Sequence, residues 1–305
     1  MTIPDALDAT LVSLNPETQL ALSGVLAVMM FTVALTLKPG DFTFVYRKPK
    51  MFFGGAVTQI LLLPLMSVGL AALIAPTPSV ALGMIVVACC PGGNVSNIMV
   101  MAARGNAAYS VALTAVSSAL AFLVTPLSIL FWASLYPPTA DLISQINVEA
   151  GPFLFQVGVT LGVPLVIGMV ISHLMPRLAA RIQPWFFGVS IGALVTLAIV
   201  GLAGNWALLL ATGALVLPVA ILHNASAFSL GALSGRVLRL DIPSRRALTF
   251  EIGIQNSGLG LVILLSQFQG LGGAAAVTAL WAVWHLISGS ALAGSFRLLD
   301  RYRRS

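Results

Sequence analysis

The chain has 305 residues, of which 58% are hydrophobic and only 8% are charged, whereas an ordinary soluble domain carries about a quarter charged residues. This composition excludes a soluble globular protein. It also leaves no room for a separate catalytic domain, because nine membrane helices of about 22 residues would occupy roughly 200 positions. The net charge of +6 could indicate nucleic acid or anionic lipid as a partner, so the positions of the charges matter more than their sum.

Nine apolar runs are long enough to cross a bilayer. They lie near residues 18–37, 51–75, 80–103, 107–136, 153–175, 184–203, 206–234, 247–269 and 273–296. If Met1 to Asn15 forms an extracytoplasmic tail, all fifteen Lys and Arg residues fall on one side of the membrane. The connections on the other side carry only acidic charges, namely Asp5, Asp8, Glu17, Asp141 and Glu149. The positive-inside rule then predicts an outer N-terminus and a cytoplasmic C-terminus.

Two of the nine runs contain residues that break helices. The third contains CCPGGNVSN (Cys89 to Asn97), and the eighth contains EIGIQNSGLG (Glu251 to Gly260). Such a pair of interrupted segments, one in each half of the chain, is typical of a secondary transporter with inverted repeats and a binding site near the bilayer midplane. The two segments enter from opposite sides, so spans 1 to 4 would pair with spans 6 to 9, leaving span 5 unpaired.

Glu251 is the strongest single candidate for function, because an ionised carboxylate in hydrocarbon needs a cation, a partner or a proton. Every Lys and Arg is expected at a cytoplasmic helix end, so a protonated Glu251, a bound cation and a proton relay remain as alternatives. Neutral oxygen donors are expected around it: Ser96, Asn97, Ser110, Thr114, Gln255 and Gln59. One carboxylate with neutral oxygens suits a monovalent cation such as sodium, since divalent ions usually recruit several carboxylates.

The remaining polar residues of the spans are harder to interpret. His285, within WAVWHLISG of the last span, could line a substrate cavity or could be structural. His223 with Asn224, and His173, are interpreted as packing or interfacial residues. No catalytic residue is predicted, because Glu251 has no second intramembrane carboxylate as an acid–base partner and no HExxH, P-loop or dinucleotide motif is present.

At CCPGGNVSN and ARGN, and again at EIGIQNSGL and WHLISGS, the chain resembles the sodium/bile acid symporter family. The resemblance extends from VALTLKPGDF (Val33 to Phe42) to the last span. It implies a core domain, whose two crossing unwound helices hold sodium, moving against a panel domain. The implied division is 1–16 as an extracytoplasmic tail, 17–50 as panel helix 1 with a cytoplasmic loop, 51–136 as core helices 2–4, 151–204 as panel helices 5–6, 205–297 as core helices 7–9 and 298–305 as a cytoplasmic tail.

The resemblance also implies roles for individual residues. One sodium site would comprise Ser96, Asn97, Ser110, Thr114 and Glu251. A second would comprise Gln59, Glu251, Gln255 and the backbone carbonyls of Ile252 and Ile254, and the substrate contacts would be Asn94, Asn256 and His285. The chain departs from the family in having only a short polar tail before its first span, which implies nine helices. It also has Leu286 where the family often has Asn, which leaves the substrate open.

The sequence therefore predicts an all-α polytopic membrane protein of nine helices that couples inward flow of two sodium ions to uptake of an organic anion. The resemblance implies that the anion is bile acid-like, or a small carboxylate such as pantoate or a 2-oxo acid. A proton-coupled carrier of the same fold and a membrane sensor or channel are the alternatives. Sodium is the only metal expected, the partners are the substrate and the lipid bilayer without nucleic acid, and the membrane is a bacterial inner membrane or a plasma membrane.

Overall fold

The computed structural model describes residues 16–203, 206–268 and 270–302, and these segments are almost entirely helical. The first half of the chain forms α2 (Pro16–Ala34), the 3-10 helix η1 (Pro39–Phe42), α3 (Thr43–Arg47), α4 (Pro49–Val57), the π-helix η2 (Thr58–Leu62), α5 (Leu63–Ile74), α6 (Pro78–Cys89), α7 (Asn94–Ala102), α8 (Ala107–Ser134) and α9 (Pro137–Gln145). The second half forms α10 (Ala150–Leu174), α11 (Pro176–Ala203), α12 (Trp206–Val237), α13 (Ile242–Gly253), α14 (Ser257–Gln267) and α15 (Gly272–Tyr302).

Local chemistry explains where several helices begin. Proline stands in the first turn of α4, α6, α9 and α13, where its missing N–H is not needed. Side-chain oxygens cap other starts: Asn106 accepts from the Tyr109 N–H at 3.1 Å, and Asn256 accepts from the Leu259 N–H at 3.1 Å. These two caps stand at the starts of α8, which carries Ser110 and Thr114, and of α14, so they help to fix the position of the candidate site.

Several helices are long and apolar enough to cross a membrane. By length and composition these are Pro49–Ile74, Ala107–Ser134, Ala150–Leu174, Gly213–Val237 and Gly272–Tyr302, with Leu20–Ala34 and Pro39–Arg47 as a pair bent by 79°. Two shorter apolar helices, α6 and α14, are halves of the third and eighth predicted spans, which are broken in the middle. The all-helical, polytopic membrane architecture is therefore confirmed at this level, whereas nine spans and inverted repeats stay predictions.

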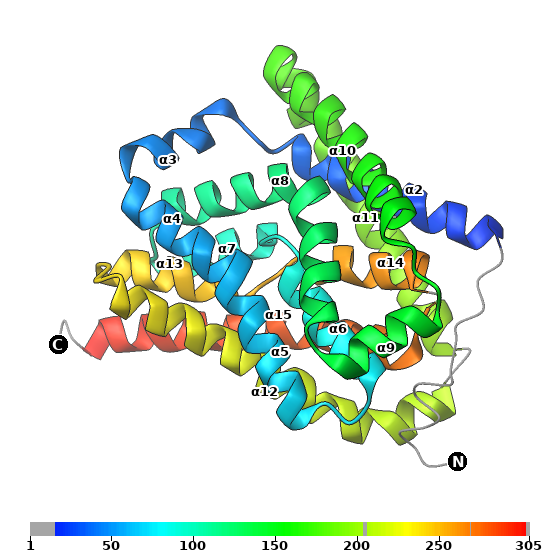
Figure 1. Ribbon diagram of the computed structural model, residues 1–305. Helices are drawn as coiled ribbons and strands as arrows, with labels where there is room; N and C mark the ends of the chain where they lie inside the picture. The colour runs from blue at the N-terminus through cyan, green and yellow to red at the C-terminus, as the bar shows by residue number, and fades with distance from the viewer. Residues whose placement is uncertain (1–15, 204–205, 269, 303–305) are drawn as a thin grey trace.

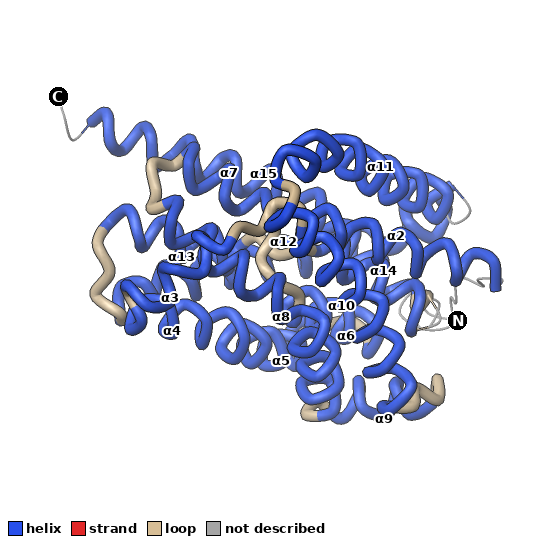
Figure 2. Tube along the Cα trace, turned by 90° about the horizontal axis from the view of Figure 1, so that it is seen from above, coloured by secondary structure: helices blue, strands red, loops and turns tan. Residues whose placement is uncertain are grey.

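The helices form two groups that pack against each other (Figure 1). In one group α2 packs against α10 and α11. In the other, α12 packs against α13 and α15, while α6 packs against α5 and α15. Contacts of α2 with α14, and of α10 with α8, join the groups. Figure 2 shows the loops of the broken helices, in tan, near the middle of this bundle rather than at its ends.

A buried ion pair ties helix ends together at one end of the second group. Arg246 of α13 holds Asp300 of α15 through two hydrogen bonds, of 2.6 and 2.9 Å. Its guanidinium also donates to the Ala103 carbonyl at the end of α7 and lies 5.0 Å from the centre of the Phe296 ring. The guanidinium of Arg246 thus binds both Asp300 and the C-terminus of α7, where a positive charge is favourable.

Candidate functional site

The two broken helices cross at their breaks. After α6 ends, Pro91 and Gly92 run extended before α7 begins, and Gln255 does the same between α13 and α14. Gly92 and Gln255 pair as an antiparallel bridge, and the Asn256 N–H donates to the Pro91 carbonyl at 2.8 Å. Some of the backbone groups that each break removes from its own helix are thus satisfied by the other break, as a low-dielectric interior requires.

Four helix ends meet at this crossing. Here α6 and α13 end, while α7 and α14 begin. Because helix N-termini carry partial positive charge and C-termini partial negative charge, the crossing offers binding positions for both signs. Glu251 lies in the last turn of α13, at an end that is already negative, so a cation beside its carboxylate would be favoured.

Glu251 is completely buried, with an exposed fraction of 0%. Its Oε2 accepts hydrogen bonds of 2.7 Å from the hydroxyls of Ser96 and Ser110, and its Oε1 accepts one from the Thr114 hydroxyl. The Asn97 Oδ1 lies 2.7 Å from the Ser110 hydroxyl and 3.4 Å from that of Thr114. All five side chains of the predicted first sodium site are therefore brought together.

The hydroxyls of this cluster have fewer protons than the acceptor oxygens that lie within hydrogen-bond distance of them. Ser96, Ser110 and Thr114 each lie within hydrogen-bond distance of two acceptor oxygens, yet each hydroxyl carries one proton. Oxygens that face one another without a proton between them repel. A cation among them, or a proton on Glu251, would remove this repulsion. No described residue forms an ion pair with Glu251; the salt bridge of the described chain joins Arg246 to Asp300.

The second predicted set also comes together. Gln59, on the π-turn η2, places its Nε2 3.4 Å from the Oε1 of Gln255, and both side chains are buried. The Gln255 Nε2 donates to the carbonyls of Glu251 and Ile252 at 2.9 and 3.0 Å, so this set is held by its own hydrogen bonds. Binding of a cation here would require the Gln255 amide to turn its oxygen toward these carbonyls. Ile254 is the C-cap residue directly after the last residue of α13.

The predicted substrate residues are placed less uniformly. Asn94 is the first residue of α7 and Asn256 caps α14, so both half-buried side chains lie at helix N-termini beside the crossing. His285 is buried on α15, with its Nδ1 2.9 Å from the Trp281 carbonyl and its ring 4.8 Å from the centre of the Trp281 ring. The structure therefore places each of the two asparagines beside the crossing and gives His285 a contact within its own helix.

Two positioning residues were given no role at the site by the sequence. Asn224, with an exposed fraction of 0%, donates from its Nδ2 to the Gly253 carbonyl at 2.8 Å and accepts from the Ser288 hydroxyl at 2.6 Å. It thereby caps the broken end of α13, two residues from Glu251. Ser117 accepts from the Gly92 N–H at 3.3 Å. The sequence signal for Asn224 was a side-chain amide inside an apolar span. Ser117 had no such signal, because single serines are common in membrane helices.

A bundle of apolar helices in which two broken helices cross at a buried carboxylate is the arrangement of a membrane transporter. Comparisons with known proteins give the family. A profile of the sodium bile acid symporter family matches residues 24–212. The chain belongs to this family of sodium-dependent transporters, and it is an integral, multi-pass membrane protein. The predictions of family membership and of a transporter rather than an enzyme are thus confirmed.

Named relatives agree with this assignment. The chain is 35% identical over 268 residues to the "Uncharacterized sodium-dependent transporter YocS" of Bacillus subtilis, covering 88% of this chain and 80% of the relative. It is 33% identical over 273 residues to the "Probable sodium/metabolite cotransporter BASS1, chloroplastic" of Arabidopsis thaliana, covering 89% and 65% of the two chains. It is 27% identical over 247 residues to the human "Ileal sodium/bile acid cotransporter", covering 80% and 68%.

The crossing predicts a steric test at Gly92. A Cβ added there would collide with the Glu251 Oε1 and lie 3.3 Å from the Gln59 Nε2. We expect Gly92→Ala to cost about 1–3 kcal/mol of stability, as overpacking does, and to lower the apparent melting temperature in detergent by several degrees.

The matched control is Gly69→Ala on α5, where an added Cβ meets no atom within 4 Å. This change should be neutral or slightly stabilising, because alanine is the better helix former. Equal melting temperatures for the two variants would contradict the close approach of Gly92 to Glu251.

Proposed function

We propose that the chain is a secondary transporter that couples inward sodium flow to the import of an organic anion by alternating access. The observation that carries the proposal is the buried Glu251 with its converging neutral oxygens and no ion-pair partner among the described residues. An isolated carboxylate at membrane depth favours a bound cation or a proton. Membership of a sodium-dependent transporter family favours sodium.

Two sodium ions are proposed to share Glu251. The first would bind among Ser96, Asn97, Ser110 and Thr114, whose side-chain oxygens already lie around the carboxylate. The second would bind among Gln59, Gln255 and the carbonyls of Ile252 and Ile254, after the Gln255 amide turns. Neutral oxygens with a single carboxylate suit a monovalent ion.

Alternating access needs two bodies that move against each other. We infer a panel of spans 1, 5 and 6 (α2, α10 and α11), within residues 17–50 and 151–204, and a core within 51–136 and 205–297 that holds the crossing. Support comes from the packing of α2 on α10 and α11, while α14 is the part of the broken helices that α2 contacts. Where α10 meets α8, Gly158 and Gly162 face Phe122, and such small residues permit close helix packing.

Nine spans in inverted repeats are part of the same proposal. The broken pairs α6–α7 and α13–α14 would each count as one span, and each pairs a 12-residue helix with a shorter one of 9 or 11 residues. An odd number of spans places all Lys and Arg residues on the cytoplasmic side, as the positive-inside rule requires. The outer N-terminus and the bacterial inner or plasma membrane follow from this proposal.

The substrate is proposed to be an organic anion with a single carboxylate or sulfate. Two sodium ions and Glu251 leave one positive charge at the crossing, and the N-termini of α7 and α14, with Asn94 and Asn256, add partial positive charge beside it. His285 is proposed as a further contact after the core moves. One relative is named for bile acid and another for a metabolite. The proposed substrate is therefore either a steroid or a small carboxylate.

The substitution Glu251→Gln tests whether a cation binds beside the Glu251 carboxylate. The change keeps the size of the side chain and removes its charge, so the apparent sodium affinity should fall by roughly 100-fold or more, as for a buried charge pair that loses one partner. Binding of radioactive sodium to purified protein and uptake of candidate anions into proteoliposomes under a sodium gradient would measure this.

The control is Glu149→Gln, which removes an exposed carboxylate before α10 and should leave sodium affinity unchanged. Uptake driven by a proton gradient and indifferent to sodium would support the proton-coupled alternative. Saturable binding without gradient-driven accumulation would support a sensor or channel.

Topology is tested by cysteine labelling in a background without Cys89 and Cys90. Asp141 on α9 and Arg239 between α12 and α13 are both exposed. With an impermeant thiol reagent outside intact cells, Asp141→Cys should react and Arg239→Cys should react only after the membrane is opened. Labelling of Arg239→Cys from outside would overturn the span count.

Charge movement tests the number of sodium ions. Two sodium ions with one monoanion carry one net positive charge inward, so a membrane potential of about 100 mV, inside negative, should add roughly 2.3 kcal/mol per cycle to the driving force. We expect a substrate-induced current on a supported proteoliposome membrane. An electroneutral cycle with a proven monoanion would reduce the coupling to one sodium ion.

A further inference from the structure

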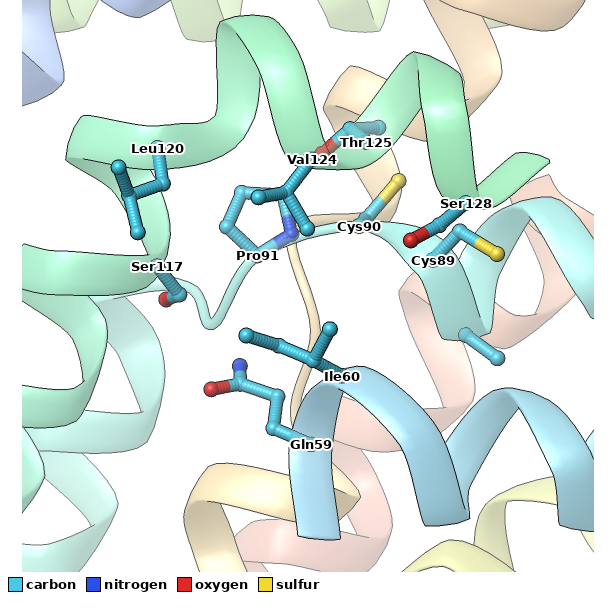
Figure 3. A pocket seen from close by; sticks show the side chains of 11 residues that line it. Gln59, Ile60, Cys89, Cys90, Pro91, Ser117, Leu120, Val124, Thr125 and Ser128 are labelled. Atoms are coloured by element: carbon cyan, nitrogen blue, oxygen red, sulfur yellow. The ribbon is translucent and has the colours of Figure 1, made fainter. Parts of the chain in front are cut away.

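A small pocket lies directly beside the second proposed sodium site. It is partly open and is bounded by η2, the end of α6, the extended segment at Pro91 and the face of α8 that carries Ser117, Thr125 and Ser128 (Figure 3). Gln59 lies on its wall. Its free volume is ≈ 20 Å³, which is enough for a water molecule, since about 10–15 Å³ suffices, and far too little for an organic anion.

Two hydroxyls in this pocket have no hydrogen-bond partner within the part of the chain that the structure describes. They belong to Thr125, whose exposed fraction is 1%, and to Ser128, one turn further along α8. Other helical hydroxyls, such as those of Thr58 and Ser67, donate to the carbonyl four residues earlier, which is the usual solution away from water. The hydroxyls of Thr125 and Ser128 are therefore available to water or an ion in the pocket.

Gln59 connects the pocket to the proposed second site, because it lines the pocket and also belongs to that site. Gln59 on its wall reaches Gln255 at 3.4 Å, and Ser117 accepts from the Gly92 N–H at 3.3 Å. The Ser117 hydroxyl also lies 3.2 Å from the carbonyl of Thr114, which is part of the first cluster. Hydroxyls thus continue along α8 from Glu251 into the pocket.

The pocket extends toward the outer half of the membrane in the proposed topology. In that topology α8 starts at the cytoplasmic side. Ser117 then lies about 15 Å from the start of α8 and Ser128 about 32 Å, at 1.5 Å per residue. Polar groups at membrane depth normally face protein or a water-filled cavity, so this line of hydroxyls marks water rather than lipid.

We propose that this pocket is the aqueous path by which sodium reaches the Gln59–Gln255 site from the extracytoplasmic side, an inference that rests on the proposed function. Along the path Ser128, Thr125 and then Ser117 would replace part of the hydration shell of the ion with neutral oxygens. The lining carries no charged group, so a monovalent cation that has lost most of its waters meets oxygen donors and no competing charge.

The test uses two neighbouring residues of α8 in protein from which Cys89 and Cys90 have been replaced by alanine. Ser128→Cys places a thiol in the pocket. Leu127→Cys places one at nearly the same depth, turned away by about 100°, at a position that is 45% exposed on the bundle surface. A small cationic methanethiosulfonate reagent, added from outside to intact cells, then reports whether water reaches each thiol.

We expect Ser128→Cys to react at least about tenfold faster than Leu127→Cys, because the reactive thiolate forms in water and not in hydrocarbon. The reaction at Ser128→Cys should be slower in a sodium buffer than in a choline buffer. The reaction at Leu127→Cys should have the same rate in both buffers. After modification, the association rate of radioactive sodium should fall in Ser128→Cys and stay unchanged in Leu127→Cys. Modification acts on folded protein, so a folding defect cannot produce this difference.

Two results would overturn the path: equal reaction rates at the two positions, or normal sodium association after modification of Ser128→Cys. Either result leaves the proposed function intact if the cysteine-free parent binds sodium in a Glu251-dependent way. If the parent binds no sodium, the proposed function fails, and the path fails with it even where Ser128→Cys reacts fast.

Discussion

The burial of one carboxylate without a counter-charge is the constraint on which the rest of the structure depends. Glu251 has an exposed fraction of 0% and is surrounded by hydroxyl and amide oxygens. A protein at membrane depth tolerates such a group only if a cation or proton completes it. Elsewhere a buried charge is satisfied permanently, as Arg246 is by Asp300. Because Glu251 has no permanent partner, the stability of the folded arrangement around it depends on which ion binds there. A coupled carrier needs that dependence.

The crossing of two broken helices is what allows this arrangement to exist inside a hydrophobic bundle. Each break frees backbone groups, and the pairing of Gly92 with Gln255 and of Asn256 with Pro91 uses them. Because the crossing joins the two halves of the chain, an ion bound there would hold four helix ends in one arrangement. Sodium and substrate would then favour each other, since each stabilises the same geometry and carries the opposite charge.

Much of the fold could be predicted because its signals are local. The apolar runs predict membrane helices through the thickness of a bilayer, and described helices overlap each run, although α11 begins earlier, at Pro176, and η1, α3 and α9 lie outside the runs. The break at Pro91 follows from a missing N–H, and Glu251 is conspicuous because a charge in hydrocarbon is costly. The likeness at these motifs to a known family supplied the ligand sets, which composition and spacing alone would have left as a loose group of oxygens.

The sequence by itself thus determined a polytopic helical membrane protein with two interrupted spans and one intramembrane carboxylate. Only the tertiary structure decided which oxygens meet: that the π-turn η2 brings Gln59 to Gln255, that Asn224 caps α13 at Gly253, and that Thr125 and Ser128 line a pocket. The physical reason is that helix rotation and crossing depend on packing between many similar Leu, Val and Ala faces. Such packing sums small contacts over the whole bundle, and no local pattern in the chain specifies it.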